Sequence, residues 1–293
     1  MTEIAPSIVV VGSLHYDIMV DAPHRPEKGE TVAGSRWYPK FGGKGGNQAV
    51  AARAVGCPVR MLGAVGEDDF GTYLLDALTA GGVDAARVRR IPGTASGISV
   101  AITDAEGDYG AVIVSGANLT IDAAALKDAT LWAGATVLIL QNEVPEAINI
   151  AAARAARAQG VLVCLNAAPA REMSGDLWAL LDVLVVNAVE ARDLCGITVD
   201  SLADAARAAH ALAERVPVAV VTAGGDGVAY AQTFGPSGME KAIPVTLVSS
   251  HGAGDVFVGA LSSELAKGSD IQHAVVQANL RAAHHVSRSS DRI

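Results

Sequence analysis

Aromatic residues are scarce in this sequence. Phe, Trp and Tyr make up only 4% of its 293 residues, whereas hydrophobic residues as a whole make up 51%. Ala, Val and Leu must therefore fill the interior, as they do where helices pack on a mainly parallel sheet. This composition argues against an all-β sandwich, and a chain of this length can bury a large core.

Cysteine is also rare. The three cysteines, Cys57, Cys164 and Cys195, lie far apart in the sequence, with no Cys-x-x-Cys pair and no histidine at the spacing of a zinc site. The sequence therefore predicts neither a disulfide framework nor a cysteine-based metal site. We expect the three thiols to be reduced.

Runs of positive charge and long apolar runs are absent too. The formal net charge is −9 without a cluster of Lys and Arg, which argues against binding along a nucleic acid. No stretch of about 18 apolar residues is free of charge, Gly or Pro, so no membrane span is expected. Residues 1–7 lack the pattern of a signal peptide, and the expected location is the cytoplasm.

Short runs rich in Val and Ile alternate with Ala-rich segments at helical spacing. The predicted buried strands are residues 8–11, 59–62, 136–140, 161–165, 183–186 and 218–222. The predicted helices include residues 47–55, 71–80, 145–158, 189–195 and 201–215. This alternation predicts right-handed βαβ units on a mainly parallel sheet flanked by helices.

Two stretches, at about residues 13–41 and 95–116, interrupt the alternation. Within them, short exposed strands are predicted at residues 18–20, 31–33, 97–103 and 111–115. We expect these strands to form a small β-sheet lid inserted into a single α/β domain spanning residues 1–293. Ligands of such folds bind beyond the carboxyl ends of the strands, so the loops that follow strands are where a site is expected.

The segment His-Gly-Ala-Gly-Asp at residues 251–255 opens an apolar helix. Its small residues allow backbone N–H groups to converge at the helix start, where the helix dipole favours a phosphate. Asp255, beside this anion hole, could accept the proton of an attacking hydroxyl during phosphoryl transfer. The alternative, an Asp that caps its own helix, stays open from this segment alone.

Another glycine-rich segment, Phe-Gly-Gly-Lys-Gly-Gly-Asn-Gln-Ala at residues 41–49, runs into an Ala-rich helix. It is not a P-loop, because Lys44 is not followed by Ser or Thr. The glycines permit close approach of the backbone to a ligand, and Lys44 and Asn47 supply hydrogen bonds of the kind that a polyol needs. A flexible loop with a solvated lysine is the alternative.

Three further loops follow predicted strands. Asp17 could accept hydrogen bonds from adjacent sugar hydroxyls, or form a turn. Asn187 and Glu190 stand one helical turn apart and could hold magnesium through its waters, or form a capping box. The small residues at 222–227 suit the phosphates or ribose of a nucleotide. All of these loops would face one crevice.

Together these motifs resemble those of the ribokinase-like (PfkB) carbohydrate kinases, from about residue 8 to residue 288, and within that family most closely the ribokinases. Residues 42–50 resemble the first family signature, residues 252–255 the second, and residues 187–190 the Asn-x-x-Glu motif. Residues 66–71 and 165–170 also resemble stretches of ribokinases. The resemblance implies a three-layer α/β fold with a mainly parallel central sheet flanked by helices. It also implies a small β-sheet lid that often serves as a dimer interface.

The resemblance further implies an ATP-dependent sugar kinase that uses Mg²⁺ and phosphorylates a primary hydroxyl of a pentose-like sugar. The sugar would contact His15, Asp17, Gly43, Lys44, Asn47 and Glu143. Asp255 would activate the hydroxyl, and Gly252, Ala253 and Gly254 would stabilise charge on the transferred phosphoryl group. The nucleotide would lie against Asn187, Thr222, Gly224, Gly227 and Asn279, and Glu190 would help to position the metal.

The sequence departs from the family pattern at four positions. Ser249 and Ser250 stand where ribokinases have an Asp-Thr pair that helps to form a monovalent-cation site, so a potassium requirement is doubtful. His15 replaces an Asn that contacts the sugar, and Val256 replaces a Thr after the catalytic base. D-ribose therefore stays open as the substrate, while phosphoryl transfer is still expected.

Two other functions are compatible with the sequence. A nucleoside kinase of the same fold would need an aromatic wall in the lid, which the scarcity of aromatic residues disfavours. A catalytically silent sugar-binding protein would keep the fold and lose turnover, against which Asp255 and the anion-hole glycines argue. The expected partners are a small sugar or nucleoside and a second copy of the chain paired through the lid.

Overall fold

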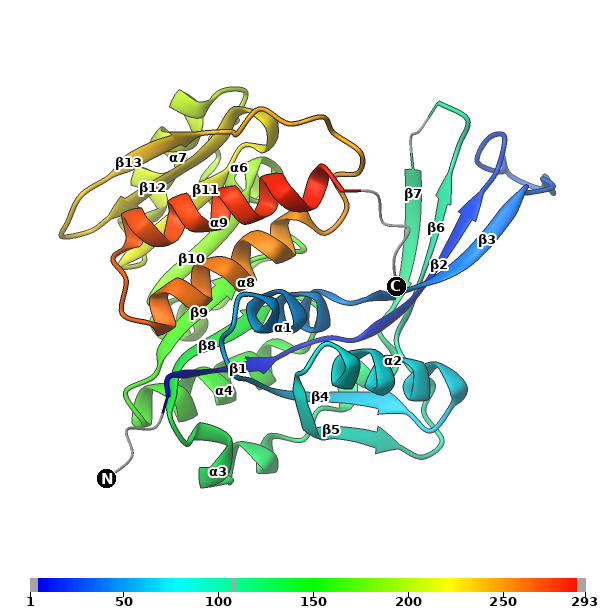
Figure 1. Ribbon diagram of the computed structural model, residues 1–293, viewed down its shortest axis with the longest axis horizontal. Coiled ribbons are helices and arrows are strands. Elements are labelled where there is room, and N and C mark those ends of the chain that lie inside the picture. The colour runs from blue at the N-terminus through cyan, green and yellow to red at the C-terminus, as the bar shows by residue number, and fades with distance from the viewer. Residues whose placement is uncertain (1–4, 107–108, 289–293) are drawn as a thin grey trace.

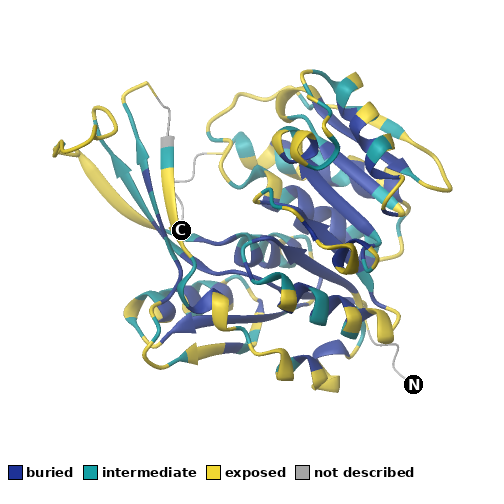
Figure 2. Cartoon of the chain, turned by 180° about the vertical axis from the view of Figure 1, so that it is seen from behind, coloured by how far each residue is buried: buried dark blue, intermediate teal, exposed yellow. Residues whose placement is uncertain are grey.

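In the computed structural model, which describes residues 5–106 and 109–288, the main body is a nine-stranded sheet. Its strand order is β13-β12-β11-β10-β9-β8-β1-β4-β5. Helices cover both faces of this sheet, and a separate four-stranded sheet projects from the body (Figure 1). Seen from behind, the strands of the main sheet are largely buried between the helices (Figure 2).

The main sheet is parallel from β5 to β11 and ends in the antiparallel strands β12 and β13. Its strands are β1 (Ser7–Val11), β4 (Val59–Gly66), β5 (Asp84–Ile91), β8 (Ala135–Gln141), β9 (Leu162–Asn166), β10 (Val183–Asn187), β11 (Val218–Thr222), β12 (Gly227–Gln232) and β13 (Gly238–Lys241). All six predicted strands form, because their β-branched runs can be buried on both faces of a parallel sheet.

Three strands of the main sheet have no counterpart among the predicted ones. β5 and β13 lie at the two edges of the sheet and are partly exposed, so neither needs a continuous apolar run. β12 is buried, but its Gly and Ala residues carry little of the β-branched signal on which strand prediction depends.

Two apolar layers enclose the main sheet. Alternate residues of β1 point into opposite layers, with Val9 and Val11 in one and Ile8 and Val10 in the other. The first layer is covered by α3 (Ala129–Trp132), α4 (Glu146–Ala158), α5 (Gly175–Trp178), α6 (Ala188–Cys195) and α7 (Leu202–Leu212). The second is covered by α1 (Lys44–Ala54), α2 (Asp69–Ala80), α8 (Ala253–Ala266) and α9 (Ile271–Val286). Short 3-10 segments occur at Gly116–Thr120, Ala123–Lys127 and Gly224–Asp226. This arrangement confirms the predicted three-layer α/β fold.

The small sheet has the order β3-β2-β6-β7 and is rooted at the carboxyl end of β1. Its strands are β2 (His15–Asp21), β3 (Arg36–Gly42), β6 (Ile98–Thr103) and β7 (Tyr109–Val114). The predicted strand at residues 31–33 is wrong. These residues precede β3, whose pairing with β2 starts only at Arg36 opposite Asp21, so their β-propensity finds no neighbouring strand.

An aromatic cluster anchors the base of the small sheet to α2. The ring of Tyr16 stacks on Phe70 with centroids 4.1 Å apart and meets the edge of Tyr73 at 4.9 Å. Because side chains alternate along a strand, Tyr16 faces α2 while His15 and Asp17 face the opposite side of the sheet. That opposite side is where the polar residues of the site gather.

Two observations concern the cysteines and the helices of the chain. Cys57, Cys164 and Cys195 are all free thiols. Among the described residues, no helix combines the length and the apolar character needed to cross a membrane.

Candidate active site

The turn between β1 and β2 packs directly against the start of α1. A Cβ atom on Gly45 would lie 2.6 Å from the backbone N of Ser13, and one on Gly12 would lie 2.8 Å from the Cα of Gly45. Gly43, the N-cap of α1, has a φ of 85°, a conformation that favours glycine. The glycines of residues 42–46, the first glycine-rich turn, therefore allow two backbones to touch.

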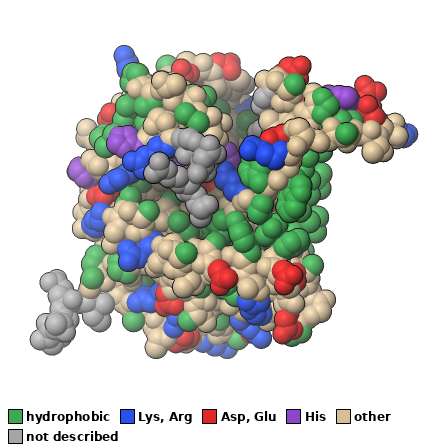
Figure 3. Space-filling view, turned by 45° about the vertical axis from the view of Figure 1, so that its right-hand side comes forward, with side chains coloured by type: hydrophobic (Ala, Val, Ile, Leu, Met, Phe, Trp, Pro, Cys, Tyr) green, Lys and Arg blue, Asp and Glu red, His purple; other side chains and the backbone are tan. Residues whose placement is uncertain are grey.

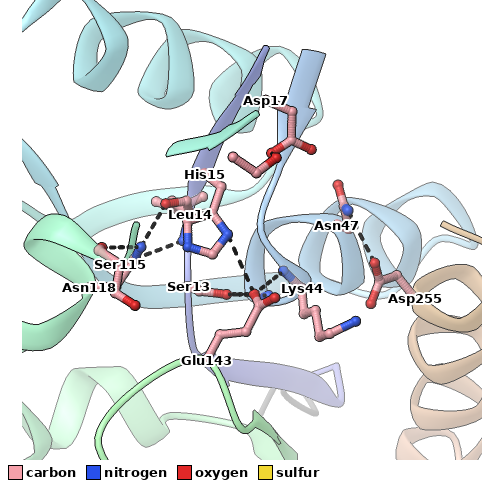
Figure 4. A network of polar contacts seen from close by, with 12 residues as sticks. Ser13, Leu14, His15, Asp17, Lys44, Asn47, Ser115, Asn118, Glu143 and Asp255 are labelled. Atoms are coloured by element: carbon pink, nitrogen blue, oxygen red, sulfur yellow. Dashed lines mark hydrogen bonds and ion pairs between the residues drawn. The ribbon is translucent and has the colours of Figure 1, made fainter. Parts of the chain in front are cut away.

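Glu143, which follows β8, holds this junction together. Its Oε2 accepts a hydrogen bond of 2.5 Å from Ser13 Oγ and one of 2.8 Å from the backbone N of Lys44. The Nδ1 atom of His15 lies 3.7 Å from the same oxygen (Figure 4). The structure thus brings together three of the residues predicted to contact the sugar, His15, Lys44 and Glu143.

Asp255 lies in the first turn of α8, whose N-cap is Gly252. The Asp255 carboxylate accepts a hydrogen bond of 3.1 Å from Asn47 Nδ2 and one of 2.9 Å from Gln48 Nε2. Asp255 therefore bonds to side chains of α1, and no side-chain hydrogen bond caps α8. The capping interpretation is wrong, and Figure 4 shows Asp255 and Asn47 meeting between the two helices.

The surroundings of Asp255 alter its proton affinity. Burial raises the pKa of the Asp255 carboxyl above its ordinary value of 3.8. The positive charge of Lys44 and the hydrogen bonds from Gln48 and Asn47 lower the same pKa, and the charge of Glu143 raises it. A buried carboxylate of this kind binds a proton more readily than an exposed one, as a general base for a hydroxyl requires.

Within the described part of the chain, the second glycine-rich turn, residues 252–254, is loosely surrounded. A Cβ on Gly254 would meet no described atom within 4 Å, and one on Gly252 would meet only the ring of His285, at 3.3 Å. The first N–H groups of a helix have no acceptor within the helix, although the N of Ala253 donates to the carbonyl O of Ser250 at 3.3 Å. This is the geometry of an anion site at a helix start.

His251 stands directly before this turn. Desolvation, together with the positive charges of Lys40 and Lys44, lowers the pKa of His251 to about 4, although the residue is still exposed. Its imidazole is therefore neutral at pH 7. The carbonyl O of His251 lies 2.9 Å from Nε2 of His285, which connects the turn to α9.

Asp17 is buried on the inner side of the small sheet. Its Oδ1 accepts a hydrogen bond of 2.6 Å from Ser99 Oγ, and burial raises the pKa of the Asp17 carboxyl. A Cβ on Gly42 would lie 2.1 Å from Asp17 Oδ2, so the absence of a side chain at Gly42 leaves the space that this carboxylate occupies. Lys40 of β3 is paired in register with Asp17.

Asn187 and Glu190 form the capping box that the sequence left as an alternative to metal binding. Asn187 Oδ1 accepts a hydrogen bond of 2.9 Å from the backbone N of Glu190, and Glu190 Oε2 accepts one of 2.8 Å from the backbone N of Asn187. Burial raises the pKa of Glu190, the hydrogen bonds from Asn187 and the charge of Lys44 lower it, and Asp255 raises it. The Glu190 carboxylate therefore lies within the electrostatic reach of Lys44 and Asp255.

The residues predicted to face the nucleotide lie at the carboxyl ends of β10 and β11 and near β13. Thr222 is paired with Asn187 across these strands, and a Cβ on Gly224 would meet no atom of the residues that the structure describes within 4 Å. Gly227 has a structural reason to be glycine, because its Cβ would lie 2.1 Å from the carbonyl O of Glu240 in β13. Asn279 of α9 donates a hydrogen bond of 2.8 Å to the carbonyl O of Lys241 at the end of β13.

The described residues contain no group of three or more His, Cys, Asp or Glu side chains that could hold a metal ion by themselves. Mg²⁺ is commonly held in another way, by one or two carboxylates together with waters and substrate phosphates. Each oxygen of Glu190 accepts a hydrogen bond from Asn187 and keeps a further lone pair. Glu190 therefore fits this second kind of magnesium site.

Four residues of the site are not among those predicted from the sequence: Gln48, Lys40, Ser99 and Asn118. Gln48 directly follows Asn47 in the first signature, and this adjacency is the only sequence signal for it. Asn118 holds the turn between β1 and β2, since it accepts a hydrogen bond of 2.9 Å from the N of Leu14 and donates one of 2.8 Å to its O. Lys40 and Ser99 enter the site only through the pairing of β2 with β3 and β6.

Comparison with known proteins agrees with this geometry. The profile of the pfkB family carbohydrate kinases matches residues 5–293. Ribokinase of Bacillus subtilis is 34% identical over 278 residues, covering 94% of this chain and 92% of the relative. Deoxyribokinase of Salmonella typhi is 31% identical over 288 residues, covering 96% and 92%. The structure of Arabidopsis thaliana ribokinase complexed with ribose and ATP superimposes with a TM-score of 0.90 at 28% identity, covering 98% of this chain and 94% of that one.

Proposed function

The chain belongs to the pfkB family of carbohydrate kinases, phosphotransferases with an alcohol group as acceptor, and from this premise we propose that it transfers the γ-phosphoryl group of ATP to a primary hydroxyl of a pentose-like sugar. The observation that carries the proposal is the meeting of Asp255 with Asn47 and Gln48. This contact places a buried carboxylate, the open second glycine-rich turn and Lys44 around one point.

In the proposed reaction, Asp255 accepts the proton of the acceptor hydroxyl. The hydroxyl oxygen forms a bond to the γ-phosphorus as the bond from that phosphorus to the β–γ bridging oxygen breaks, and ADP leaves with the electron pair. The backbone N–H groups at Gly252, Ala253 and Gly254 face the charge that develops on the phosphoryl oxygens. Lys44 contributes a positive charge to the same region.

The proposed acceptor site lies between the first glycine-rich turn and the inner side of the small sheet, which acts as a lid. Asp17 and Asn47 would accept and donate hydrogen bonds to adjacent hydroxyls, with Glu143 and His15 at the inner wall. The names of the relatives, ribokinase and deoxyribokinase, support a pentose. The ribose and ATP bound to the Arabidopsis thaliana neighbour support the same substrate class.

The proposed nucleotide site lies at the carboxyl ends of β10 and β11. Thr222 and Gly224 would face the phosphates and ribose, with Asn187 beside them and Gly227 and Asn279 toward the base. The open space above Gly224 supports this placement. Because ATP is the proposed donor, we propose the cytoplasm as the place of action.

Mg²⁺ is the metal that we propose for this site. Glu190 would hold it through water, and the nucleotide phosphates would complete its ligands. The ion would supply positive charge that offsets the negative charge of the phosphate oxygens.

The proposal includes no potassium requirement. Ser249 and Ser250 offer only neutral hydroxyls, and Ser249 Oγ accepts a hydrogen bond of 3.3 Å from the N of His251.

We also propose that two copies of the chain associate through the outer side of the small sheet. The residues that alternate with Asp17 and Lys40 on β2, β3 and β6 form this side, and they are largely apolar: Ile18, Val20, Trp37, Pro39, Val100 and Ile102. Trp37 is 64% exposed, and Val112 and Val114 of β7 are 68% and 53% exposed. Hydrophobic side chains gather on the flank that carries the small sheet (Figure 3). A face this apolar on a monomer indicates an interface.

The test of the proposed function is a panel of acceptors. Purified protein with ATP and Mg²⁺ is given ribose, 2-deoxyribose, hexoses and nucleosides in turn, and release of ADP is followed in a coupled assay. We expect turnover with a pentose in preference to hexoses and nucleosides. A preference for nucleosides would support the nucleoside kinase, and binding of a sugar without ADP release would support the silent binder. Replacing Na⁺ by K⁺ in the assay is expected to change the rate little.

A further inference from the structure

Lys40 is a charged residue of the site to which neither the motifs nor the proposed reaction assigns a role. It lies on β3, two residues before the first glycine-rich turn, and is paired in register with Asp17 on β2. Side chains of a directly paired couple lie on the same side of a sheet. Lys40 therefore faces inward with Asp17, whereas its neighbour Phe41 contacts the opposite side, where a Cβ on Gly46 would lie 2.7 Å from the Phe41 ring.

The charge of Lys40 acts on groups at both the acceptor side and the phosphoryl side of the site. The side chain is partly buried, and burial lowers the pKa of Lys40 while Asp17 raises it. The charge of Lys40 also contributes to the lowered pKa of His251, the residue that precedes the second glycine-rich turn. Lys40 is thus placed beside Asp17 by the strand pairing, and its charge reaches the residue that precedes that turn.

The charges of the site favour a role in phosphate binding for a positively charged group such as Lys40. Four carboxylates face the site, from Asp17, Glu143, Glu190 and Asp255, and each of them repels an incoming triphosphate. Lys44 acts on Asp255 and Glu190, so part of its charge is offset within the protein. Phosphoryl transfer spreads negative charge over three oxygens and is accelerated by fixed positive groups around them.

We propose that Lys40 is a further catalytic residue, whose ammonium contacts the phosphoryl group in transit from the inner side of the small sheet. This proposal rests on the proposed kinase function. It gives the small sheet a chemical part in the reaction, because Lys40 is carried by β3 and reaches the phosphoryl group only while that sheet covers the acceptor.

The experiment compares Lys40→Met, which keeps an unbranched side chain one atom shorter and removes the charge, with Lys40→Arg. Lys28→Met is the matched control, because Lys28 is exposed in the connection between β2 and β3. We expect Lys40→Met to lower kcat about 100-fold with the KM of the acceptor nearly unchanged. Lys40→Arg is expected to recover part of the loss, and Lys28→Met to match the parent. Unchanged thermal unfolding of all three variants shows that they are folded.

A second measurement tests the contact between Lys40 and the phosphoryl group without turnover. Binding of ADP with aluminium fluoride, which imitates the planar phosphoryl group, is expected to weaken at least tenfold in Lys40→Met while binding of ADP alone is unchanged. A kcat within threefold of the parent would overturn the proposal, and so would a loss confined to the KM of the acceptor, which would assign Lys40 to sugar recognition. A parent protein inactive on every acceptor would instead refute the kinase function itself.

Discussion

The two glycine-rich turns of the site look alike in sequence and differ in what their glycines do. In the first turn, a Cβ on each of Gly42, Gly43, Gly45 and Gly46 would approach another atom to within 3.0 Å. In the second turn, a Cβ on Gly254 would meet no atom of the described residues within 4 Å. Small residues serve packing inside the protein in one case and leave space for something outside it in the other.

The glycines of the first turn therefore serve the packing of the protein, and those of the second turn serve a ligand site. The first turn presses α1 against the turn after β1, and so places Asn47 and Gln48 where they reach Asp255. The second turn lies at a helix start, where N–H groups have no acceptor within the helix, and among the described residues the position of a Cβ on Gly254 is open. A ligand phosphate is therefore expected at residues 252–254, and the first turn should tolerate change poorly even without a ligand.

Removing the charge of Asp255, which lies where the two turns meet, is expected to have the largest effect on activity. Asp255→Asn keeps the shape of the side chain and removes the proton acceptor, so kcat should fall by about 10³-fold or more while the sugar still binds. Coupled ADP release measures the rate and titration calorimetry the sugar binding. Turnover within about tenfold of the parent would refute the role of Asp255 as base.

The scaffold role of the first turn is tested by Gly45→Ala. The new Cβ would lie 2.6 Å and 2.7 Å from backbone atoms of Ser13 and Gly12, so one of the two segments must shift. We expect a loss of about 3 kcal/mol in the free energy of unfolding, measured in urea. Gly175→Ala is the control, because a Cβ there meets no atom within 4 Å. Equal stability of the two variants would contradict the packing role.

The ligand role of the second turn is tested by Gly254→Ala. A Cβ there occupies only open space, and Ala favours a helix over Gly by up to about 1 kcal/mol, so stability should stay equal or rise. The kcat is expected to fall at least about tenfold, which corresponds to about 1.4 kcal/mol of lost transition-state binding.

Gly259→Ala in the same helix is the matched control for Gly254→Ala. Its Cβ would lie 2.7 Å from Ala51 Cβ and from the N of Ala52 in α1. This variant should lose stability in the urea measurement, as a scaffold glycine does. If Gly254→Ala lost as much stability as Gly259→Ala, the distinction between the two kinds of glycine would fail.

The smallest expected effect is on how the stability of the protein changes with pH. Burial raises the pKa of Asp255 above its ordinary value, so the folded state holds this proton at pH values where the unfolded state has released it. Between the two pKa values, the stability contributed by Asp255 therefore decreases as pH rises. Asp255→Asn lacks this loss and should be more stable than the parent at pH 7, with a smaller difference near pH 3.5. Urea unfolding at both pH values measures it, and a variant less stable than the parent at pH 7 would contradict the sign.

The fold was largely predictable because its central strands carry their own signal. The β-branched runs of β1, β8, β10 and β11 are apolar on both faces, as a strand inside a parallel sheet must be. The edge strand β5 was not predicted, and the strand predicted at residues 31–33 does not form. Both errors have the same physical reason. Pairing with a neighbour, which a local pattern does not contain, decides whether a weakly apolar segment becomes a strand.

The sequence by itself determined the two glycine-rich turns, the loops at the carboxyl ends of the strands, and which carboxylates and amides stand in them. Only the tertiary structure decided that Asp255 bonds to α1 instead of capping α8, that Asn187 and Glu190 close on each other, and that Lys40 faces Asp17. The physical reason is that a side chain bonds to whatever lies nearest in space. Those neighbours are up to 208 residues away in the chain, as Asn47 is from Asp255.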